Sequence, residues 1–415
     1  MLRYDAPTAA EAAQLMEQYQ VGSSFFFSSP RKTLLTHGEY SRLLPVPAGT
    51  GHRSLPERVR ELLEFAKQAG RPDAVVVGAI PFDIQKPASL FIPLSAQWHD
   101  SLLFSEGGDP EMPRISSYKV LSVPEPTAFK EGVNRLLDLI SQKKLHKAVL
   151  SRTLDITLPH ALSIPQILTH LAYHHSHGYT FAVPLAPELS HASSPYAVAS
   201  TRTLFGASPE LLVTKKGSRI KGNPLAGSAA RSADPAEDQR RAAALLSSAK
   251  DRYEHAIVID AVASALQPYC SKLEVPAEPS LVQTKAMWHL STEINGVLKD
   301  ESVTSLELAL AMHPTPAICG TPTDAARDAI QEIEPFDRGF YSGAVGWSDA
   351  NGDGEWAVTI RCAETEGTLL RVFAGAGIVT GSIAEAELAE TSAKFRTILA
   401  AMGLNEQQTT MSEEE

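Results

Sequence analysis

Two stretches of this chain carry acidic residues at helical spacing. Asp251 and Glu254 lie three residues apart in the segment 249–266, and Glu387 and Glu390 repeat that spacing in the segment 384–402. On a helix, side chains three residues apart share one face. Four carboxylates that converge from two helices would offer Mg²⁺ the oxygen ligands that it prefers. Because acidic pairs on helices are often only solvated charge, the spacing alone leaves both interpretations open.

Two further ionisable residues lie among apolar neighbours. Lys147 belongs to the strand-like run 147–158, and Glu210 follows a Ser-Pro turn and precedes an apolar run. At an exposed edge, each would simply extend its charged end into water. In an enclosed site, burial lowers the pKa of the lysine toward that of a general base. Burial also raises the pKa of the carboxyl group, which makes it a candidate proton donor.

Two glycine-containing segments resemble ligand-binding loops. The segment "FAGAGIVTGS" (373–382) lacks the Gly-Lys-Ser/Thr ending of a P-loop and the acidic residue of a dinucleotide-binding unit. We interpret it as a bend between a strand and a helix, whose backbone N–H groups hold a carboxylate. The segment "SDANGDGEW" (348–356) matches half of an EF-hand loop, but Ile360 stands where a bidentate glutamate is needed. A polar hairpin is predicted there.

Strands and helices alternate through the second half of the chain and must position these residues. Strand patterns cover residues 147–158, 204–215, 343–349, 355–364 and 369–379, and short turns join many of them. Helices are predicted from Pro235, capped by Asp234, to about Leu266, and again up to Gly403. These features predict an α+β fold with a large, mostly antiparallel, β-sandwich-like core and helices packed outside.

Composition narrows the classes of function. The formal charge of −11, from 37 basic and 48 acidic residues, disfavours a nucleic-acid partner. It also means that an anionic substrate has to be attracted by a locally positive site. Three widely spaced cysteines suggest neither disulfides nor a zinc cluster and favour a reducing, cytoplasmic setting. No signal peptide or apolar run of membrane-spanning length is present, so no membrane association is expected.

The motifs together resemble the chorismate-utilising enzymes. They are "HKAVLSR", "GASPELL", "NPLAGSAAR", "KDRYEH", "WHLST", "HPTPAICGTP", "EPFDRGFYSGAVGW", "GDGEWAVTIRCA" and "FAGAGIV", in the order that this family shows. Within the family, the chain most resembles isochorismate synthases of the siderophore type, which feed 2,3-dihydroxybenzoate synthesis. The resemblance is densest over residues 140–403. It implies one chorismate-binding catalytic domain at 21–403, after an N-terminal helix or arm at 1–20 and before a disordered polar tail at 404–415.

The resemblance also implies a reaction and a set of site residues. Chorismate would be isomerised to isochorismate by addition of water at C2 and loss of the C4 hydroxyl, with Lys147 as general base and Glu210 as general acid. Glu254 and Glu390 match the Mg²⁺ ligands, supported by Asp251 and Glu387. The positions that match substrate-binding residues are Gly227, Ser228, His289, Ala317, Arg361, Gly375, Gly377 and Lys394. A monomer without a glutaminase subunit is expected.

Three positions separate this chain from its relatives. Aminodeoxychorismate synthases carry a nucleophilic lysine where this chain has Ala226, and anthranilate synthases lack the lysine that Lys147 matches. Ammonia-using relatives tend to carry threonine in place of Ala317. Salicylate synthase, which goes on to eliminate pyruvate from isochorismate, shares the base, the acid and the metal ligands and remains the alternative. A catalytically silent chorismate-binding protein is disfavoured, because the base, the acid and the metal ligands all match the family pattern.

Overall fold

The computed structural model describes most of the chain. The described residues are 14–45, 53–102, 115, 117–175, 177–186, 201–285 and 287–404, without the side chain of residue 397. Most of the predicted N-terminal arm and the polar tail after residue 404 therefore lie outside the described residues. At the edges of those segments, Leu15, Met16 and Leu404 are buried in the core. No helix in the described part is long and apolar enough to cross a membrane.

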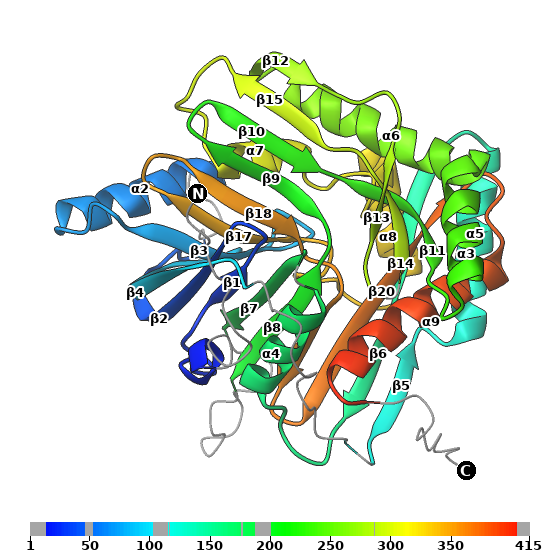
Figure 1. Ribbon diagram of the computed structural model, residues 1–415, viewed down its shortest axis with the longest axis horizontal. Helices are drawn as coiled ribbons and strands as arrows, with labels where there is room; N and C mark the ends of the chain where they lie inside the picture. Colours follow the sequence, from blue (N-terminus) through cyan, green and yellow to red (C-terminus); the bar gives the residue numbers. More distant parts are fainter. Residues whose placement is uncertain are drawn as a thin grey trace.

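One large antiparallel sheet dominates the molecule (Figure 1). Its strands, in order of pairing, are β12 (Cys270–Glu274), β15 (Ile294–Leu298), β10 (Arg219–Asn223), β9 (Leu211–Lys216), β18 (Gly354–Val358), β17 (Ala344–Asp349), β3 (Val75–Ile80), β4 (Ser89–Asp100), β2 (Lys32–Arg42), β1 (Phe26–Ser28), β7 (Tyr179–Leu185), β8 (Arg202–Ser208), β19 (Cys362–Glu366), β20 (Leu369–Val379) and β6 (Lys147–Thr157), with β5 (Lys119–Val123) and β16 (Gly320–Thr321) both on β6. A smaller sheet joins β11 (Leu225–Ala230), β14 (Met287–Ser291) and β13 (Ser280–Gln283).

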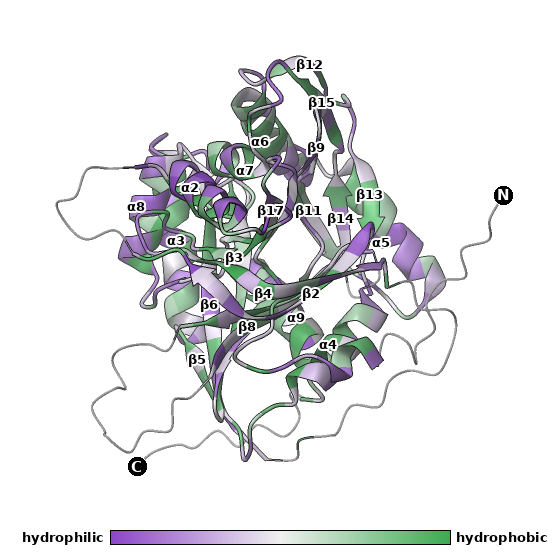
Figure 2. Cartoon of the chain, turned by 90° about the vertical axis from the view of Figure 1, so that its left-hand side faces the viewer, coloured by the Kyte–Doolittle hydropathy of each residue, from purple (hydrophilic) through white to green (hydrophobic). Residues whose placement is uncertain are grey.

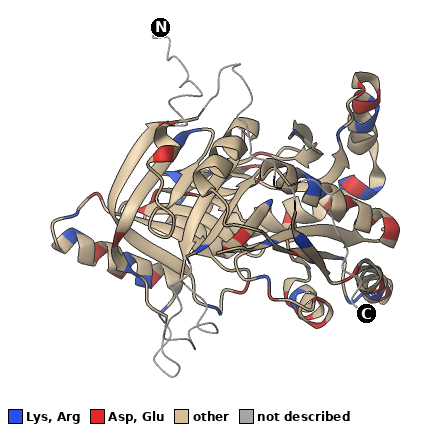
Figure 3. Ribbon diagram, turned by 90° about the horizontal axis from the view of Figure 1, so that it is seen from below, with Lys and Arg blue, Asp and Glu red and all other residues tan. Residues whose placement is uncertain are grey.

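The helices pack on the outside of these sheets. They are α2 (Leu55–Gln68), α3 (Pro126–Ser141), α4 (Ile164–His174), α5 (Pro235–Ser247), α6 (Ala249–Leu266), α7 (Ser305–Met312), α8 (Thr323–Ile333) and α9 (Ala384–Ala401). Figure 2 shows hydrophilic outer faces on α2, α5 and α8, and Figure 3 shows many positions of charged residues along the helices and few along the central strands. The predicted α+β architecture, with an antiparallel core and helices outside, is confirmed.

Apolar faces fix the two helices that carry the acidic pairs. Helix α9 buries Phe395, Ile398 and Leu399 against the sheet, and α6 buries Val258 and Val262 in a neighbouring cluster. Each helix has its acidic pair in its first two turns, away from these anchors. Burial of the apolar stripes therefore holds both acidic ends in place.

The predicted single helix from Pro235 to Leu266 is wrong. It is two helices, because Ser248 between them adopts an extended conformation (φ −67°, ψ 117°). The Ser248 hydroxyl accepts a hydrogen bond from the Asp251 N–H at 3.2 Å, which starts α6 afresh. The break places Asp251 in the first turn of a helix, where the helix dipole favours negative charge.

The segment 373–382 agrees with the strand pattern predicted over 369–379 and does not form a bend at its first glycines. Residues 373–379 continue strand β20, and only the turn that follows leads to α9. Its glycines are needed because of close neighbours: a Cβ on Gly375 would lie 2.6 Å from Ser151 Oγ, and one on Gly377 would lie 2.1 Å from Glu254 Oε1. The predicted hairpin at 348–356 is confirmed, with Ser348 paired to Gly354.

Candidate active site

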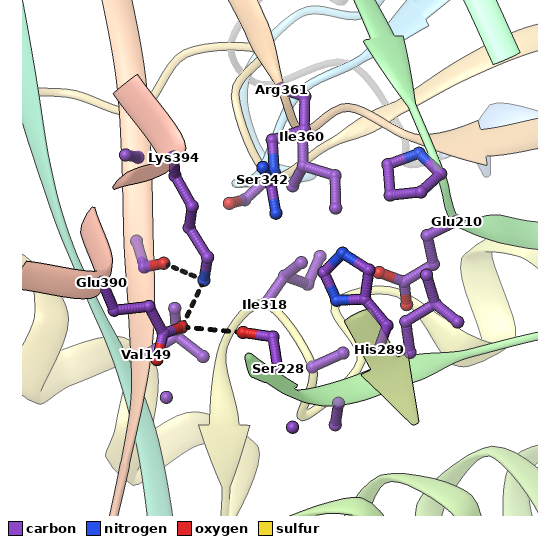
Figure 4. Close-up of a pocket in the computed structure, with 18 of the residues that line it drawn as sticks. Val149, Glu210, Ser228, His289, Ile318, Ser342, Ile360, Arg361, Glu390 and Lys394 are labelled. Carbon is purple, nitrogen blue, oxygen red and sulfur yellow. Dashed lines mark hydrogen bonds and ion pairs between the residues drawn. The ribbon is translucent and has the colours of Figure 1, made fainter. Parts of the chain in front are cut away.

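A pocket of about 730 Å³ opens between α6, α9, β11, β14 and β20 (Figure 4). Eleven of the fourteen predicted site residues line it, namely Glu210, Gly227, Ser228, Glu254, His289, Ala317, Arg361, Gly375, Gly377, Glu390 and Lys394. The other three, Lys147, Asp251 and Glu387, lie behind its wall. Residues far apart in the sequence are thus brought to one pocket.

Lys147 lies fully buried beneath the pocket wall, at the first position of β6. Its Nζ atom donates to Glu254 Oε1 at 2.7 Å, across 107 positions of sequence. Gly377 covers this pair, since a Cβ there would also come within 3.2 Å of Lys147 Cε. The lysine is therefore enclosed, as predicted, but a carboxylate partner compensates its charge, which the sequence analysis did not foresee.

Glu210 occupies the segment between β8 and β9 and is 2% exposed. Burial raises the pKa of its carboxyl group to about 8; a hydrogen bond from the backbone of Leu225 and the charge of Lys147 act in the opposite direction but more weakly. The carboxyl group is therefore mostly protonated at neutral pH. This is the direction expected from the sequence for an enclosed carboxyl beside a pocket.

A second carboxylate of the site, that of Glu390 on α9, is held by a lysine of the same helix. Lys394 Nζ donates to Glu390 Oε1 at 2.6 Å and to the Gly375 carbonyl at 2.7 Å. Ser228 Oγ donates to the same Glu390 oxygen at 3.3 Å. The pKa of Glu390 is lowered, because Lys394 and the other donors outweigh the desolvation that raises it. Glu390 is thus an ionised carboxylate on the pocket wall.

The charges of Glu254 and Glu390 act on the two carboxylates behind the pocket wall, Asp251 and Glu387. Burial is the main cause that raises the pKa of Asp251, and the charges of Glu254 and Glu390 raise it further. Burial and the charge of Glu390 likewise raise the pKa of Glu387, although Lys250 donates to it at 2.9 Å. Asp251 and Glu387 therefore both lie near enough to Glu390 to feel its charge, a proximity that the spacing in the sequence left open.

The converging carboxylates fit a hard cation by donor type, since all four offer oxygen ligands. Three of them are held by ammonium groups, from Lys147, Lys250 and Lys394. In the described part of the chain, no group of three or more acidic, histidine or cysteine side chains is already gathered at coordination distance. A metal ion would therefore compete with lysines for these oxygens.

Arg361 places a buried guanidinium group on the pocket wall, away from the carboxylates of α6 and α9. Its backbone lies in the left-handed region, with φ at 51°, which is uncommon for a residue other than glycine and occurs at functional sites. Burial lowers the pKa of its guanidinium to about 10, so the group stays charged at neutral pH. Figure 4 shows Arg361 and Lys394 reaching into the space between Glu390 on one side and His289 and Glu210 on the other.

His289 faces the same space from β14, directly across from Ser228 on β11. Its side chain is 6% exposed, and its Nε2 atom has no hydrogen-bond partner among the described residues. Its pKa lies well below the usual range, because of burial first and then the positive charges of Arg361 and Lys394. A neutral imidazole therefore presents an unused polar atom to the pocket.

Strand β20 turns backbone groups toward the pocket edge. The N–H groups of Ser151 and Val149 on β6 bond to partners outside β20. In an antiparallel ladder, the facing residues Gly375 and Gly377 then direct their own N–H groups away from β6. Strand β19 pairs with β20 only as far as Val372 and does not cover them. The backbone donors predicted here are thus supplied by a strand edge rather than by a helix N-terminus.

The pocket also contains residues that the sequence analysis did not single out. Tyr341 stacks on Phe373 with ring centroids 4.9 Å apart, and both line the pocket. Ser342 lies beside them with φ at 58° and a buried hydroxyl without a partner among the described residues. The motif "EPFDRGFYSGAVGW" contained two of these three residues, but nothing in their types marked them as pocket residues.

Comparison with known proteins agrees with this geometry. A family model described as chorismate binding enzyme matches residues 92–403. This chain belongs to the chorismate-binding enzyme family. It is 52% identical to isochorismate synthase DhbC of Bacillus subtilis, over 98% of this chain and all of the relative. It is 39% identical to isochorismate synthase EntC of Escherichia coli, over 97% of this chain and all of that relative.

Solved structures give the same result for this chorismate-binding enzyme. A crystal structure from Bacillus anthracis described as 2,3-dihydroxybenzoate-specific isochorismate synthase has a TM-score of 0.86 and 48% identity, and the match covers 95% of this chain and all of the other. Anthranilate synthase component I of Streptococcus pneumoniae, at 21% identity and a TM-score of 0.68 over 89% of this chain and 92% of the other, shares the fold. The isochorismate synthase of the 2,3-dihydroxybenzoate type predicted from the motifs is confirmed.

Proposed function

We propose that this enzyme isomerises chorismate to isochorismate with Glu210 as the acid and Lys147 as the base. The observation that carries the proposal is a buried carboxyl group with a pKa of about 8 on one side of the pocket, and a buried lysine behind the wall on another. Loss of the C4 hydroxyl requires a proton, because hydroxide is a poor leaving group, and Glu210 holds one at neutral pH. Addition of water at C2 requires removal of a proton, for which Lys147 is placed.

Lys147 must lose its contact with Glu254 before it can act as a base. An ammonium group has three donors and no acceptor, so the ion pair at 2.7 Å keeps the nitrogen lone pair occupied by a proton. Once the Glu254 carboxylate has moved away and Lys147 has released a proton to solvent, the neutral amine can accept a proton from the water at C2. The protons of the substrate balance, because Lys147 takes the proton of the water at C2 and Glu210 gives one to the oxygen that leaves C4. Exchange with solvent then removes the proton from Lys147 and returns one to Glu210 before the next turnover.

The two carboxylates of chorismate call for two anion-binding walls. We assign the enolpyruvyl carboxylate to Arg361, whose planar guanidinium can bind both oxygens, assisted by the N–H groups of Gly375 and Gly377. The ring carboxylate belongs beside Lys394 and the carboxylates of α6 and α9. His289 and the Gly227–Ser228 turn line the remaining side, and Ala317 leaves room there without adding a polar group.

Mg²⁺ is the cofactor that these carboxylates suit. Glu254 and Glu390 line the pocket and would be its ligands, with Asp251 and Glu387 as supporting groups behind them. When bound, the ion would hold the ring carboxylate and take up negative charge that develops during the reaction. The donor set, which consists only of oxygens from two converging helices, supports this choice over a softer metal.

Product analysis tests the proposal directly. Purified protein is incubated with chorismate and either Mg²⁺ or EDTA, and the products are separated by HPLC and identified by NMR. Isochorismate that forms only with metal is the expected result. Salicylate together with pyruvate would instead show that the same site continues to elimination, and the assignment would move to salicylate synthase.

The same proposal covers assembly, location and pathway. We propose a cytoplasmic monomer without a glutaminase subunit, acting toward a 2,3-dihydroxybenzoate siderophore. The relatives described as isochorismate synthases carry no subunit designation in their names, whereas the Streptococcus pneumoniae structure is titled component I. Light scattering on the purified enzyme tests the monomer, and a mass near 90 kDa, twice the 44.7 kDa of the chain, would contradict it.

A further inference from the structure

A second depression adjoins the active-site pocket. We call it the histidine groove, a space of about 1160 Å³ whose charged and imidazole side chains are His170, His174, His175, Arg231, Lys285 and Arg396. A neighbouring space of about 690 Å³ shares four of these residues and extends to Pro209. Pro209 also lines the active-site pocket and directly precedes Glu210. The groove therefore leads up to the acid side of the active site.

The two spaces share helix α9 and strand β11. Helix α9 places Lys394 in the active-site pocket and its neighbours Ala393 and Arg396 in the histidine groove. Strand β11 places Ser228 in the pocket, and Ala230 at its end lines the groove. Two elements, α9 and β11, therefore carry residues of both spaces.

The histidine groove is lined by basic side chains, although the chain as a whole carries a negative formal charge. None of the described residues that line either of the two adjoining spaces is aspartate or glutamate, although the chain carries a formal charge of −11. Asp238 offsets Arg231 at 2.8 Å. Lys285 is exposed and donates to His174 Nδ1 at 2.9 Å, an acceptor that carries no negative charge. Within the described part of the chain, no carboxylate forms an ion pair with Lys285, so its charge is available to a passing anion.

The positive fields of the groove and of the active site overlap at His175. Burial is the main cause that lowers the pKa of this histidine to about 4, followed by the positive charge of Arg361 in the pocket. Lys285 and the neighbouring histidines act on it in the same direction. One imidazole between the two spaces therefore feels cations from both.

We propose that the histidine groove is the approach route of the dianionic substrate, and that Lys285 speeds association by attracting the substrate to the mouth of the pocket. The proposal rests on the proposed function, since chorismate carries two carboxylates. The negative charge of the whole protein repels such a molecule at long range, and a positive lane beside the pocket counters that repulsion. Lys285 does not touch the reacting atoms, so it affects the association rate and leaves the chemical steps alone.

Stopped-flow fluorescence can measure this association. The Arg231 Cζ atom lies over the Trp288 ring, 4.6 Å from its centroid, so the fluorescence of Trp288 serves as a reporter of binding beside the groove. Chorismate and Mg²⁺ are mixed with Glu210→Gln enzyme, in which turnover is blocked, at about 20 mM and about 500 mM NaCl, which give weak and strong screening. Adding Lys285→Gln should lower the association rate constant about threefold at low salt. This value follows from the attraction between the single positive charge of Lys285 and the two negative charges of chorismate at about 10 Å in water. At high salt the difference should disappear.

Lys299→Gln, in the same background, is the matched control. Lys299 is also exposed, donates to a backbone carbonyl and leaves the same net charge when replaced, but it follows β15, away from the groove. An association rate constant that is equal in the two variants at low salt would overturn the proposal. A loss that persists at high salt would also overturn it, because a direct contact would then be responsible. In both cases the enzyme with Glu210 intact would still turn over chorismate; an enzyme that neither binds nor converts chorismate would overturn the proposed function itself.

Discussion

Gly377→Ala is the substitution whose effect follows most directly from the geometry. Gly377 lies in β20 with an ordinary strand backbone, so alanine causes no strain in φ. The new Cβ would lie 2.1 Å from Glu254 Oε1, whereas real Cβ contacts are not shorter than 3.0 Å. The carboxylate must therefore move by about 1 Å from the position in which it lines the pocket and holds Lys147 at 2.7 Å. A displacement of about 1 Å in an active site costs about 100-fold in rate.

The expected result is a fall of about 100-fold in kcat for isochorismate formation, equivalent to about 2.7 kcal/mol. HPLC of the product over a range of chorismate concentrations gives kcat and KM, and thermal unfolding reports whether the fold survives. Gly222→Ala in β10 is the matched control, because its Cβ would meet one backbone oxygen at 3.1 Å and lies outside the pocket. A folded Gly377→Ala enzyme within about threefold of the wild-type kcat would refute the reasoning.

Four further predictions concern the proposed roles. Lys147→Ala should abolish turnover while the protein still binds chorismate by equilibrium dialysis, and a near-normal rate would remove Lys147 as the base. Glu210→Gln should lower kcat by about 10²- to 10⁴-fold, and because the raised pKa of about 8 keeps wild-type Glu210 protonated only below that pH, wild-type kcat/KM should fall as the pH rises above 8. Glu254→Ala should lose its response to added Mg²⁺ in a metal titration of activity; stimulation equal to that of wild type would exclude Glu254 as a ligand. Arg361→Lys should raise KM by about 10-fold or more, since one bidentate charged contact is worth about 1.5–3 kcal/mol, and an unchanged KM would move the enolpyruvyl carboxylate elsewhere.

Residue types and local spacing were enough to predict the parts of the site that depend on one element. The pairs Asp251–Glu254 and Glu387–Glu390 each lie on one helical face, whereas the sequence left open whether Glu210 is exposed or buried. Three of the strand patterns in the second half of the chain, 147–158, 343–349 and 369–379, match single strands, because period-two alternation does not depend on distant contacts. The patterns 204–215 and 355–364 each divide into two strands instead, with breaks at 209–210 and 359–361. The family motifs carried the remaining site residues.

What the sequence could not supply were contacts between distant elements and choices between similar local energies. The partner of Lys147 lies 107 positions away, and no local pattern announces it. The break at Ser248 arises because a serine hydroxyl can cap a new helix, an outcome that helical periodicity on both sides conceals. The strand pattern over 369–379 was correct, but the glycines within it also suggested a bend, whereas the reason for glycine here is the crowding of neighbouring side chains.

The pairing of β20 with β6 has a consequence for how the active site comes into being. The eleven paired positions are separated by between 212 positions (Leu369 and Thr157) and 232 positions (Val379 and Lys147). Such pairing has a high contact order, so its loop-closure entropy must be overcome late and folding is slow. During synthesis, Lys147 leaves the ribosome more than 200 residues before the strand and helix that cover it. The catalytic pocket is therefore one of the last parts of the molecule to exist, and a chain truncated before β20 would have no wall to bind substrate.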